Sequence, residues 1–401
     1  MRHFLGPQVP IECSFFRIPR ISARIAGFWP QSPNGPPRTS LTVLRFCVNT
    51  FAVALGAFGE NFYGFMYLDD LFSALEAFCP GVTKVISLLK MTMFFVRHKR
   101  WQRVIHAMRM LLLQDTSNEK RRIMEPLASF ASLLSFALLA AGSLTNTFFN
   151  VSPLVKMVYY KWQSQETPLL LPFKVVLPEL LVNLPYYPAT YLMLTLSGAM
   201  TVFTFSAVDG FFLCACLYTC ALFRMLQFDI RHTFAELQEL EYSTLLQNVR
   251  IQRRLAVLVE RHNKVIDLCS DFASEFTLIV LMHFLSAALV LCFSILDMML
   301  NSASIGIVTY IFYSIAALTQ LFLYCIGGTY VSESSVEVAQ VIYDIDWYKC
   351  DLRTRRMLLI MLQRAQKAKT IAVPFFTPSL SAFRSIISTA GSYITLLKTF
   401  I

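Results

Sequence analysis

Charged side chains are scarce in this sequence: they make up 15% of its 401 residues, where a soluble globular protein carries about 25%. Hydrophobic residues account for 56% of the chain and the mean hydropathy is +0.54. This balance does not fit a soluble protein and predicts a chain that lies mostly within a lipid bilayer. The net charge of +10 then predicts basic cytoplasmic loops, and we expect no binding to nucleic acid.

The residue clusters of enzymes and metal sites are also missing. The six histidines and ten cysteines are scattered, and none has the spacing of zinc ligands or of a secreted disulfide framework. The sequence contains neither a glycine-rich phosphate loop nor a signal-peptide segment. Asp209 and His283 lie in apolar segments, where we expect structural pairing rather than catalysis. We therefore expect no enzyme activity, no bound metal and no cofactor.

Seven apolar segments are long enough for the crossing of a bilayer, which takes about 20 helical residues. They are Leu41–Met66, Leu71–Val96, Pro126–Phe149, Tyr186–Phe223, Phe272–Leu300, Ile305–Tyr330 and Phe376–Ile401. Glu60, Lys84 and Lys90 interrupt the first two segments, and such side chains should face protein or a cavity rather than lipid. The pattern predicts an all-α membrane protein with seven transmembrane helices.

The expected organisation has four regions. They are a cytoplasmic tail at 1–40, the first six helices within 41–330, a cytoplasmic anchor region at 331–370 and the last helix within 371–401. Two long connections, Arg97–Glu125 and Asn150–Pro185, are expected to be loops.

The distribution of lysine and arginine predicts the orientation of the chain. These residues are dense in the N-terminal tail and in the second-to-third, fourth-to-fifth and sixth-to-seventh connections, and nearly absent from the first-to-second and fifth-to-sixth. The positive-inside rule places the N-terminus in the cytoplasm and the C-terminus outside, opposite to a G-protein-coupled receptor. The sequon at Asn150 then lies outside, where it predicts either a glycan or a chance tripeptide.

The last segment carries hydroxyl residues at alternating steps of four and three, which places them on one stripe of a helix. They are Ser381, Ser385, Ser388, Ser392, Thr395 and Thr399. Such a stripe either lines an aqueous path or allows close helix packing. A transporter would show an internal repeat, and none is present, so a receptor or a channel remains. A pore lined by one helix per chain requires a ring of several chains.

Several motifs, most of them near the C-terminus, resemble those of the insect odorant receptor family. They are Asp209-Gly210-Phe211-Phe212, Ser332-Glu333-Ser334, Trp347-Tyr348, the run from Leu359 to Gln366 and the run from Gly391 to Leu397. The resemblance implies a ligand-gated, non-selective cation channel in the plasma membrane of olfactory neuron dendrites. It implies a heterotetramer in which divergent odorant-binding subunits assemble with a shared co-receptor.

Two departures refine that resemblance. The chain lacks the co-receptor's long insertion between the fourth and fifth spans, so it is similar to a tuning subunit. Ser392 and Thr399 stand where the related gustatory receptors have threonine and glutamine, which weakens the gustatory alternative. A membrane receptor or scaffold that does not conduct is the other alternative.

The resemblance also implies roles for individual residues. Leu396 matches an apolar gate near the outer end of the last helix, and the expected pore residues are Ser388, Ser392, Thr395, Leu396 and Thr399. The expected assembly residues of the anchor are Trp347, Tyr348, Leu358, Leu359 and Leu362.

A small volatile ligand should bind in the outer halves of spans two, three, four and six. The residues expected there are Phe72, Leu75, Glu76, Cys79, Ala141, Thr145, Asn146, Phe149, Tyr187, Tyr191, Leu194, Thr309, Tyr310 and Tyr313. The tyrosine and threonine hydroxyls could bind an ester, alcohol or ketone oxygen. No cation that could bind a carboxylate odorant is evident among them.

Overall fold

A computed structural model describes residues 15–30, 39–113, 117–163, 169–238, 245–300 and 306–398 of the chain. These residues form helices joined by short connections, with one isolated bridge between Val373 and Phe376. The helices are α2 (Arg17–Ala26), α3 (Ser40–Met66), α4 (Leu71–Val96), α5 (His98–Leu113), α6 (Asn118–Trp162), α7 (Glu179–Val182), α8 (Tyr187–Gln238), α9 (Leu245–Leu300), α10 (Gly306–Asp344), the 3-10 turn η1 (Trp347–Lys349), α11 (Leu352–Ala365) and α12 (Leu380–Lys398).

Six of the described helices, α3, α4, α6, α8, α9 and α10, are long and apolar enough to cross a membrane. Together with α12 they follow the order of the seven predicted segments, and the prediction of an all-α membrane protein is confirmed. Helix α8 forms the centre of the bundle, since 89% of its most apolar stretch is buried. It packs against α6, α10, α2 and α3. A helix that is apolar on all sides is stable in such a central position.

The N-terminal tail contributes to this core. Phe15 and Phe16 are buried, and their rings contact Tyr218 and Phe211 of α8. Helix α2 continues the contact, because the Ser22 hydroxyl shares a hydrogen bond of 3.0 Å with the hydroxyl of Ser206. The prolines and arginines of this tail gave no indication that it packs against a membrane helix.

The connection Arg97–Glu125, expected to be a loop, is largely helical, and the first part of the connection Asn150–Pro185 continues α6 as far as Trp162, so the loop prediction was wrong for these parts. Residues 98–113 form α5, in which Trp101 is fully buried and stacks on Phe94 at 4.3 Å between ring centroids. Its high content of basic residues marks an amphipathic helix rather than a loop. Helix α6 likewise begins at Asn118 and continues to Trp162, through Pro153, well beyond the predicted span.

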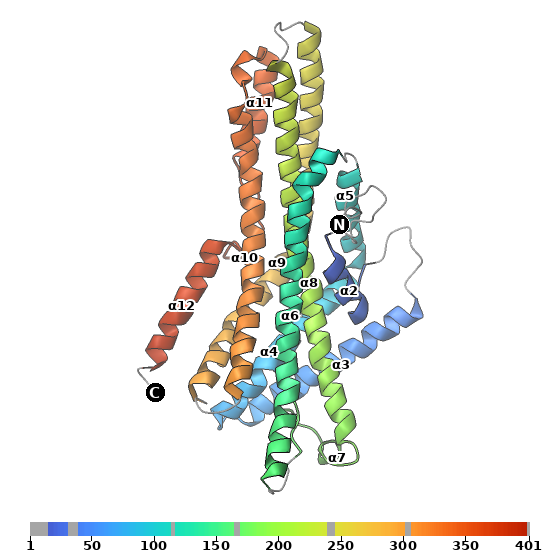
Figure 1. Ribbon diagram of the computed structural model, residues 1–401, viewed down its shortest axis with the longest axis vertical. Coiled ribbons are helices and arrows are strands. Elements are labelled where there is room, and N and C mark those ends of the chain that lie inside the picture. The colour runs from blue at the N-terminus through green and yellow to red at the C-terminus, as the bar shows by residue number, and fades with distance from the viewer. Residues whose placement is uncertain are drawn as a thin grey trace.

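At one end of the molecule α8 and α9 extend past the apolar region and run beside α10 and α11 (Figure 1). Gln252 of α9 donates to Asp351, the N-cap residue of α11, at 3.1 Å. Asp229 of α8 binds both Lys120 and Arg261 at 2.7 Å. This cytoplasmic anchor therefore includes the ends of α8 and α9 in addition to residues 331–370.

Helix α12 stands apart from the bundle, and its C-terminal end points away from α11 (Figure 1). It is attached where it begins: the Leu380 amide donates to the Thr329 hydroxyl at 3.0 Å, and Phe383 contacts Phe322. Gly328 permits this approach, because a Cβ there would lie 2.2 Å from the carbonyl oxygen of Pro378.

Candidate functional site: a buried cavity between four helices

A cavity of about 70 Å³ lies between α4, α6, α8 and α10. This is several times the roughly 10–15 Å³ that one water requires. Its wall is largely apolar and aromatic, with a few polar groups. The described lining residues are Pro80, Thr83, Lys84, Leu138, Gly142, Thr145, Asn146, Phe149, Phe173, Gly198, Thr201, Val202, Phe205, Tyr313, Ala316 and Gln320. Such a composition is typical of a site for a small hydrophobic molecule.

Two local features shape the wall. Pro80 lies inside α4, where it removes one hydrogen bond of the helix. The carbonyl of Cys79 beside it accepts hydrogen bonds from Thr83 at 2.9 Å and from the Tyr313 hydroxyl of α10 at 2.7 Å. On the opposite wall Gly198 leaves space, since a Cβ there would collide with the side chain of Asn146.

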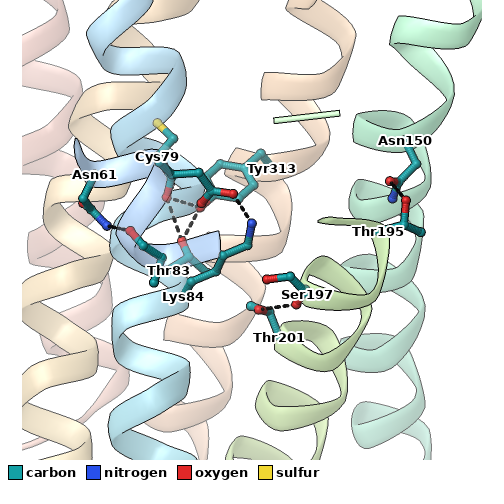
Figure 2. A network of polar contacts seen from close by, with 11 residues as sticks. Asn61, Cys79, Thr83, Lys84, Asn150, Thr195, Ser197, Thr201 and Tyr313 are labelled. Atoms are coloured by element: carbon teal, nitrogen blue, oxygen red, sulfur yellow. Dashed lines mark hydrogen bonds and ion pairs between the residues drawn. The ribbon is translucent and has the colours of Figure 1, made fainter. Parts of the chain in front are cut away.

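A buried ion pair lies at the edge of the cavity. Lys84 of α4 binds Glu60 of α3, and their side chains are 2% and 0% exposed. The ammonium of Lys84 also lies 3.7 Å from the centre of the Phe173 ring, within the range of a cation–π interaction. In Figure 2 Lys84 extends from α4, and the dashed line from its ammonium marks the ion pair. No cation was evident among the residues expected at the ligand site, and the structure places Lys84 in the wall of this cavity.

A second and larger pocket, of about 400 Å³, lies beside the first. It is more polar, and the ion pair between Glu76 and Lys174 forms part of its wall. Phe149 and Phe173 line both pockets, and their rings stack at 5.3 Å between centroids. These two rings form the partition between an outer pocket and an inner cavity.

A second buried polar cluster lies on the other side of Phe205, away from Lys84. Lys90 binds Asp209 at 2.6 Å, and the Tyr324 hydroxyl donates to the same carboxylate oxygen at 2.6 Å. His283 lies 3.4 Å from Lys90, whose ammonium sits 4.2 Å from the centre of the Phe205 ring. Asp209 and His283 are paired, as expected for polar groups within the membrane.

Comparison with known proteins places this arrangement in a family. The family model described as 7tm Odorant receptor matches residues 70–391. The chain belongs to the odorant receptor family. Odorant receptor 22c of Drosophila melanogaster is 52% identical to it over 400 residues, which cover 98% of this chain and 99% of that one. Odorant receptor 24a of the same organism is 33% identical over 99% of each chain. The receptor is a multi-pass protein of the plasma membrane.

Solved structures share its fold. The insect olfactory receptor OR5 from Machilis hrabei gives a TM-score of 0.79 at 14% sequence identity, over 95% of this receptor and 97% of that chain. The structure of the same protein in complex with eugenol gives a TM-score of 0.80 at 15% identity, over 96% and 98%. At this identity the likeness shows the seven-helix fold.

The cavity is formed by the four helices that the resemblance named, but by residues that were only partly predicted. Thr145, Asn146, Phe149 and Tyr313 line the inner cavity. Glu76, Thr309 and Tyr310 line the outer pocket together with Phe149. Phe72 lies beside this pocket, where its ring centre is 5.3 Å from the ammonium of Lys174.

The remaining predicted ligand residues line neither pocket. Leu75, Cys79 and Leu194 are buried in helix packing, and Ala141 precedes the lining residue Gly142. The Tyr187 hydroxyl donates to the carbonyl of Leu170 at 2.6 Å, and that of Tyr191 donates to the carbonyl of Asn150.

From the sequence we expected the ligand residues of α8 to be Tyr187, Tyr191 and Leu194, which lie nearer the start of this helix than the residues that line the inner cavity. The α8 residues of the inner cavity are Gly198, Thr201, Val202 and Phe205. Gly198, Thr201 and the neighbouring Ser197 are small, but small residues such as Ala207, Gly210 and Ala215 recur along α8. The sequence therefore gave no clear signal for the position of the cavity along this helix.

Asn150, the expected glycosylation site, lies within α6. Its side-chain amide donates to the carbonyl of Asn146 at 2.7 Å, and its side-chain oxygen accepts from Thr195 of α8 at 2.8 Å (Figure 2). A glycan requires a free amide in an accessible segment. This geometry speaks against a glycan at Asn150.

The predicted pore residues lie on or just beyond α12. Ser388 and Ser392 are exposed. Thr395 and Leu396 lie in the last turns of this helix, where only the backbone is described, and Thr399 lies outside the described residues.

Four of the five predicted assembly residues line an apolar groove of about 330 Å³ on the anchor. Its described lining residues are Ile342, Tyr343, Trp347, Leu352, Arg355, Arg356, Leu358, Leu359 and Leu362. Leu358 is buried at its base, whereas Trp347 and Leu359 are exposed. Tyr348 is also exposed but points to Asp346, to which its hydroxyl donates at 3.1 Å, and is not part of the groove.

Proposed function

We propose that this odorant receptor is the tuning subunit of a ligand-gated, non-selective cation channel, in which α12 lines the pore and a co-receptor supplies the partner subunits. The observation that carries the proposal is the exposed hydroxyl stripe of α12. Ser381, Ser385, Ser388 and Ser392 are exposed in the single chain, whereas Phe383 and Ile386 pack against the bundle. Close packing within the chain does not account for the stripe, while contact with water or a neighbouring subunit does.

The inner cavity supports the binding of a small volatile molecule. Four aromatic rings, those of Phe149, Phe173, Phe205 and Tyr313, contribute to its wall, and burial of an odorant against them supplies the hydrophobic part of the affinity. The related olfactory receptor solved in complex with eugenol supports a small aromatic volatile as the kind of ligand.

The groove on the anchor supports assembly with other subunits. Its rim exposes Tyr343, Trp347, Leu352 and Leu359, an aromatic and apolar set of the kind that forms interface cores. Arg355 and Arg356 border it and would contribute polar contacts at the edge of an interface.

Expression together with a family co-receptor tests the proposal through odorant-evoked cation current. Leu396→Ala should raise the resting current or change ion preference, because it removes the apolar constriction expected near the outer end of α12. Surface delivery is measured in parallel by labelling of an epitope tag. A receptor that reaches the surface and gives no current with a broad panel of volatiles would be a non-conducting receptor, and the proposal would be wrong.

A further inference from the structure

We propose that the ion pair of Lys84 and Glu60 restricts the inner cavity to neutral odorants that carry a hydrogen-bond-accepting oxygen, such as ketones, aldehydes and esters, and excludes carboxylates and amines. This inference rests on the proposed function, because it concerns the ligand class of the same cavity.

The position of Lys84 is the first argument. Among the described residues that line the cavity, Lys84 is the one with a charged side chain. It reaches the wall because Gly56 of α3 has no side chain: a Cβ there would lie 3.2 Å from the ammonium nitrogen and 2.5 Å from the Ser197 hydroxyl. The ammonium and the hydroxyl therefore both lie beside Gly56.

The second argument is the donor capacity of Lys84. An ammonium group has three N–H donors and no acceptor. Glu60 accepts one of them and the face of the Phe173 ring receives another. The remaining donor can bind a ligand oxygen in the cavity, and a hydrogen bond to a charged donor is stronger than one between neutral groups.

The hydroxyl groups of the wall compete poorly for such a ligand, because their protons are already used. Thr145 donates to the carbonyl of Ala141, Thr201 to that of Ser197, and Tyr313 to that of Cys79. Asn146 and Gln320 add neutral amides, which makes Lys84 the cationic donor of this wall.

Two buried oxygen atoms beside the pair also have no hydrogen-bond partner among the described residues. They are Oε2 of Glu60 and the hydroxyl of Ser197. Buried polar atoms are almost always satisfied. The Ser197 hydroxyl can donate to an accepting oxygen such as that of a ketone or an ester, whereas Oε2 of Glu60 in the ion pair accepts and requires a donor such as a water. The unpartnered hydroxyl therefore supports a ligand oxygen beside the pair.

The third argument is the charge of the pair. Whichever partner holds the proton, Lys84 and Glu60 together carry no net charge. A carboxylate or an ammonium ligand would therefore leave one uncompensated charge in an apolar cavity within the membrane, which is strongly unfavourable. A neutral carbonyl oxygen binds Lys84 without changing that balance.

The test uses the receptor with its co-receptor and measures the current evoked by matched odorants. Small ketones, aldehydes and esters are each compared with a hydrocarbon of the same shape and with the corresponding carboxylate, for example acetophenone with ethylbenzene and benzoate. The main variant replaces both partners, as Glu60→Gln with Lys84→Met. Removal of a whole buried pair is tolerated far better than removal of one partner.

We expect the unmodified receptor to respond to carbonyl odorants at concentrations about tenfold to hundredfold below those of the hydrocarbons, and not to the carboxylates. The ratio of the effective concentration of the hydrocarbon to that of the carbonyl odorant should fall toward one in the double variant, while the response to hydrocarbons remains. Glu60→Gln alone leaves Lys84 without its counterion and should admit carboxylates. A defect of folding or gating would shift all ligands equally and leave the ratio unchanged.

A matched control removes an identical pair elsewhere: Glu260→Gln with Lys264→Met, an exposed ion pair on the cytoplasmic part of α9. The control should leave the ratio unchanged. An unchanged ratio in the Glu60 and Lys84 variant, or a response to carboxylates in the unmodified receptor, would overturn the inference. The absence of current with every ligand class, at normal surface delivery, would instead count against the proposed channel function.

Discussion

Lys90 and Asp209 are both fully buried, and each depends on the other for charge compensation. Lys90→Met should therefore reduce the free energy of unfolding by about 3–5 kcal/mol, because it leaves Asp209 uncompensated. The expected result is loss of the receptor from the cell surface, measured by epitope labelling. Lys90→Met combined with Asp209→Asn should recover part of the surface signal, and no recovery would contradict a role in charge compensation.

His262 gives the cytoplasmic anchor a dependence on pH. Burial, with a further contribution from nearby Arg364, lowers the pKa of this side chain to about 4. In the unfolded chain this imidazole has its ordinary pKa of about 6.5. The contribution of neutral His262 to the free energy of unfolding is therefore fully present above about pH 6.5 and is lost as the pH falls toward 4. The loss reaches up to about 3 kcal/mol.

The thermal unfolding midpoint of the detergent-solubilised receptor should accordingly fall between about pH 7.5 and about pH 5.5. His262→Gln carries no titratable group and should flatten this dependence. An equal slope in the two proteins would assign the acid sensitivity to other residues.

Lys84 shows how far single residues could be interpreted from sequence. A lysine inside an apolar segment predicts that the residue faces protein or a cavity, and it does. The sequence could not predict that it faces this particular cavity, because that depends on the rotation of α4 against α3 and α8. Because of the same uncertainty we expected ligand residues of α8 at Tyr187–Leu194, whereas the α8 residues that line the inner cavity lie between Gly198 and Phe205.

Gly328 determines how α12 joins the bundle. Gly328→Ala would bring a methyl group against the Pro378 carbonyl, a backbone atom that cannot move without moving the start of α12. We expect a loss of about 1–3 kcal/mol, measured as a lower thermal unfolding midpoint. Gly59→Ala is the matched control, since its Cβ would lie at an ordinary 3.4 Å from Val175. Equal midpoints for the two variants would contradict this role.

At the scale of helices, the long apolar segments were predictable, whereas the amphipathic helix α5 was not. The seven segments agree with α3, α4, α6, α8, α9, α10 and α12, because exclusion from water sets their length and composition. Helix α5 was missed because its apolar residues are dispersed among basic ones. The structure shows that this helix packs through Trp101, Val104, Ile105, Met108 and Leu111, which are all buried. Trp101 lies between the rings of Phe94 and Phe276.

The whole receptor is expected to assemble through the anchor, and adjacent residues allow a sharp test. Leu359 and Ile360 are similarly exposed, at 63% and 67%, but only Leu359 lines the groove. Leu359→Asp should weaken association with the co-receptor at least tenfold, as expected when a charge replaces an interface anchor. Ile360→Asp is the control. Co-purification of both variants at the unmodified level would contradict a subunit contact at this groove.

The architecture of the molecule could be predicted from two patterns that extend over the whole sequence. Hydropathy predicted the crossings, and the distribution of lysine and arginine predicted which side each connection faces. The packing of residues 15–30 against α8 followed from neither, because it depends on aromatic contacts between segments about 200 residues apart in the chain, such as Phe15 with Tyr218.

The stacked rings of Phe149 and Phe173 affect how long an odorant stays bound as well as how tightly it binds. A molecule that passes between the inner cavity and the outer pocket must push these aromatic rings apart, although they pack on each other. Departure is then limited by the motion of the rings, and the dwell time of an odorant can outlast its presence at the surface. A neuron that relies on such a receptor would register the recent history of an odour plume, smoothing fast fluctuations into a sustained signal.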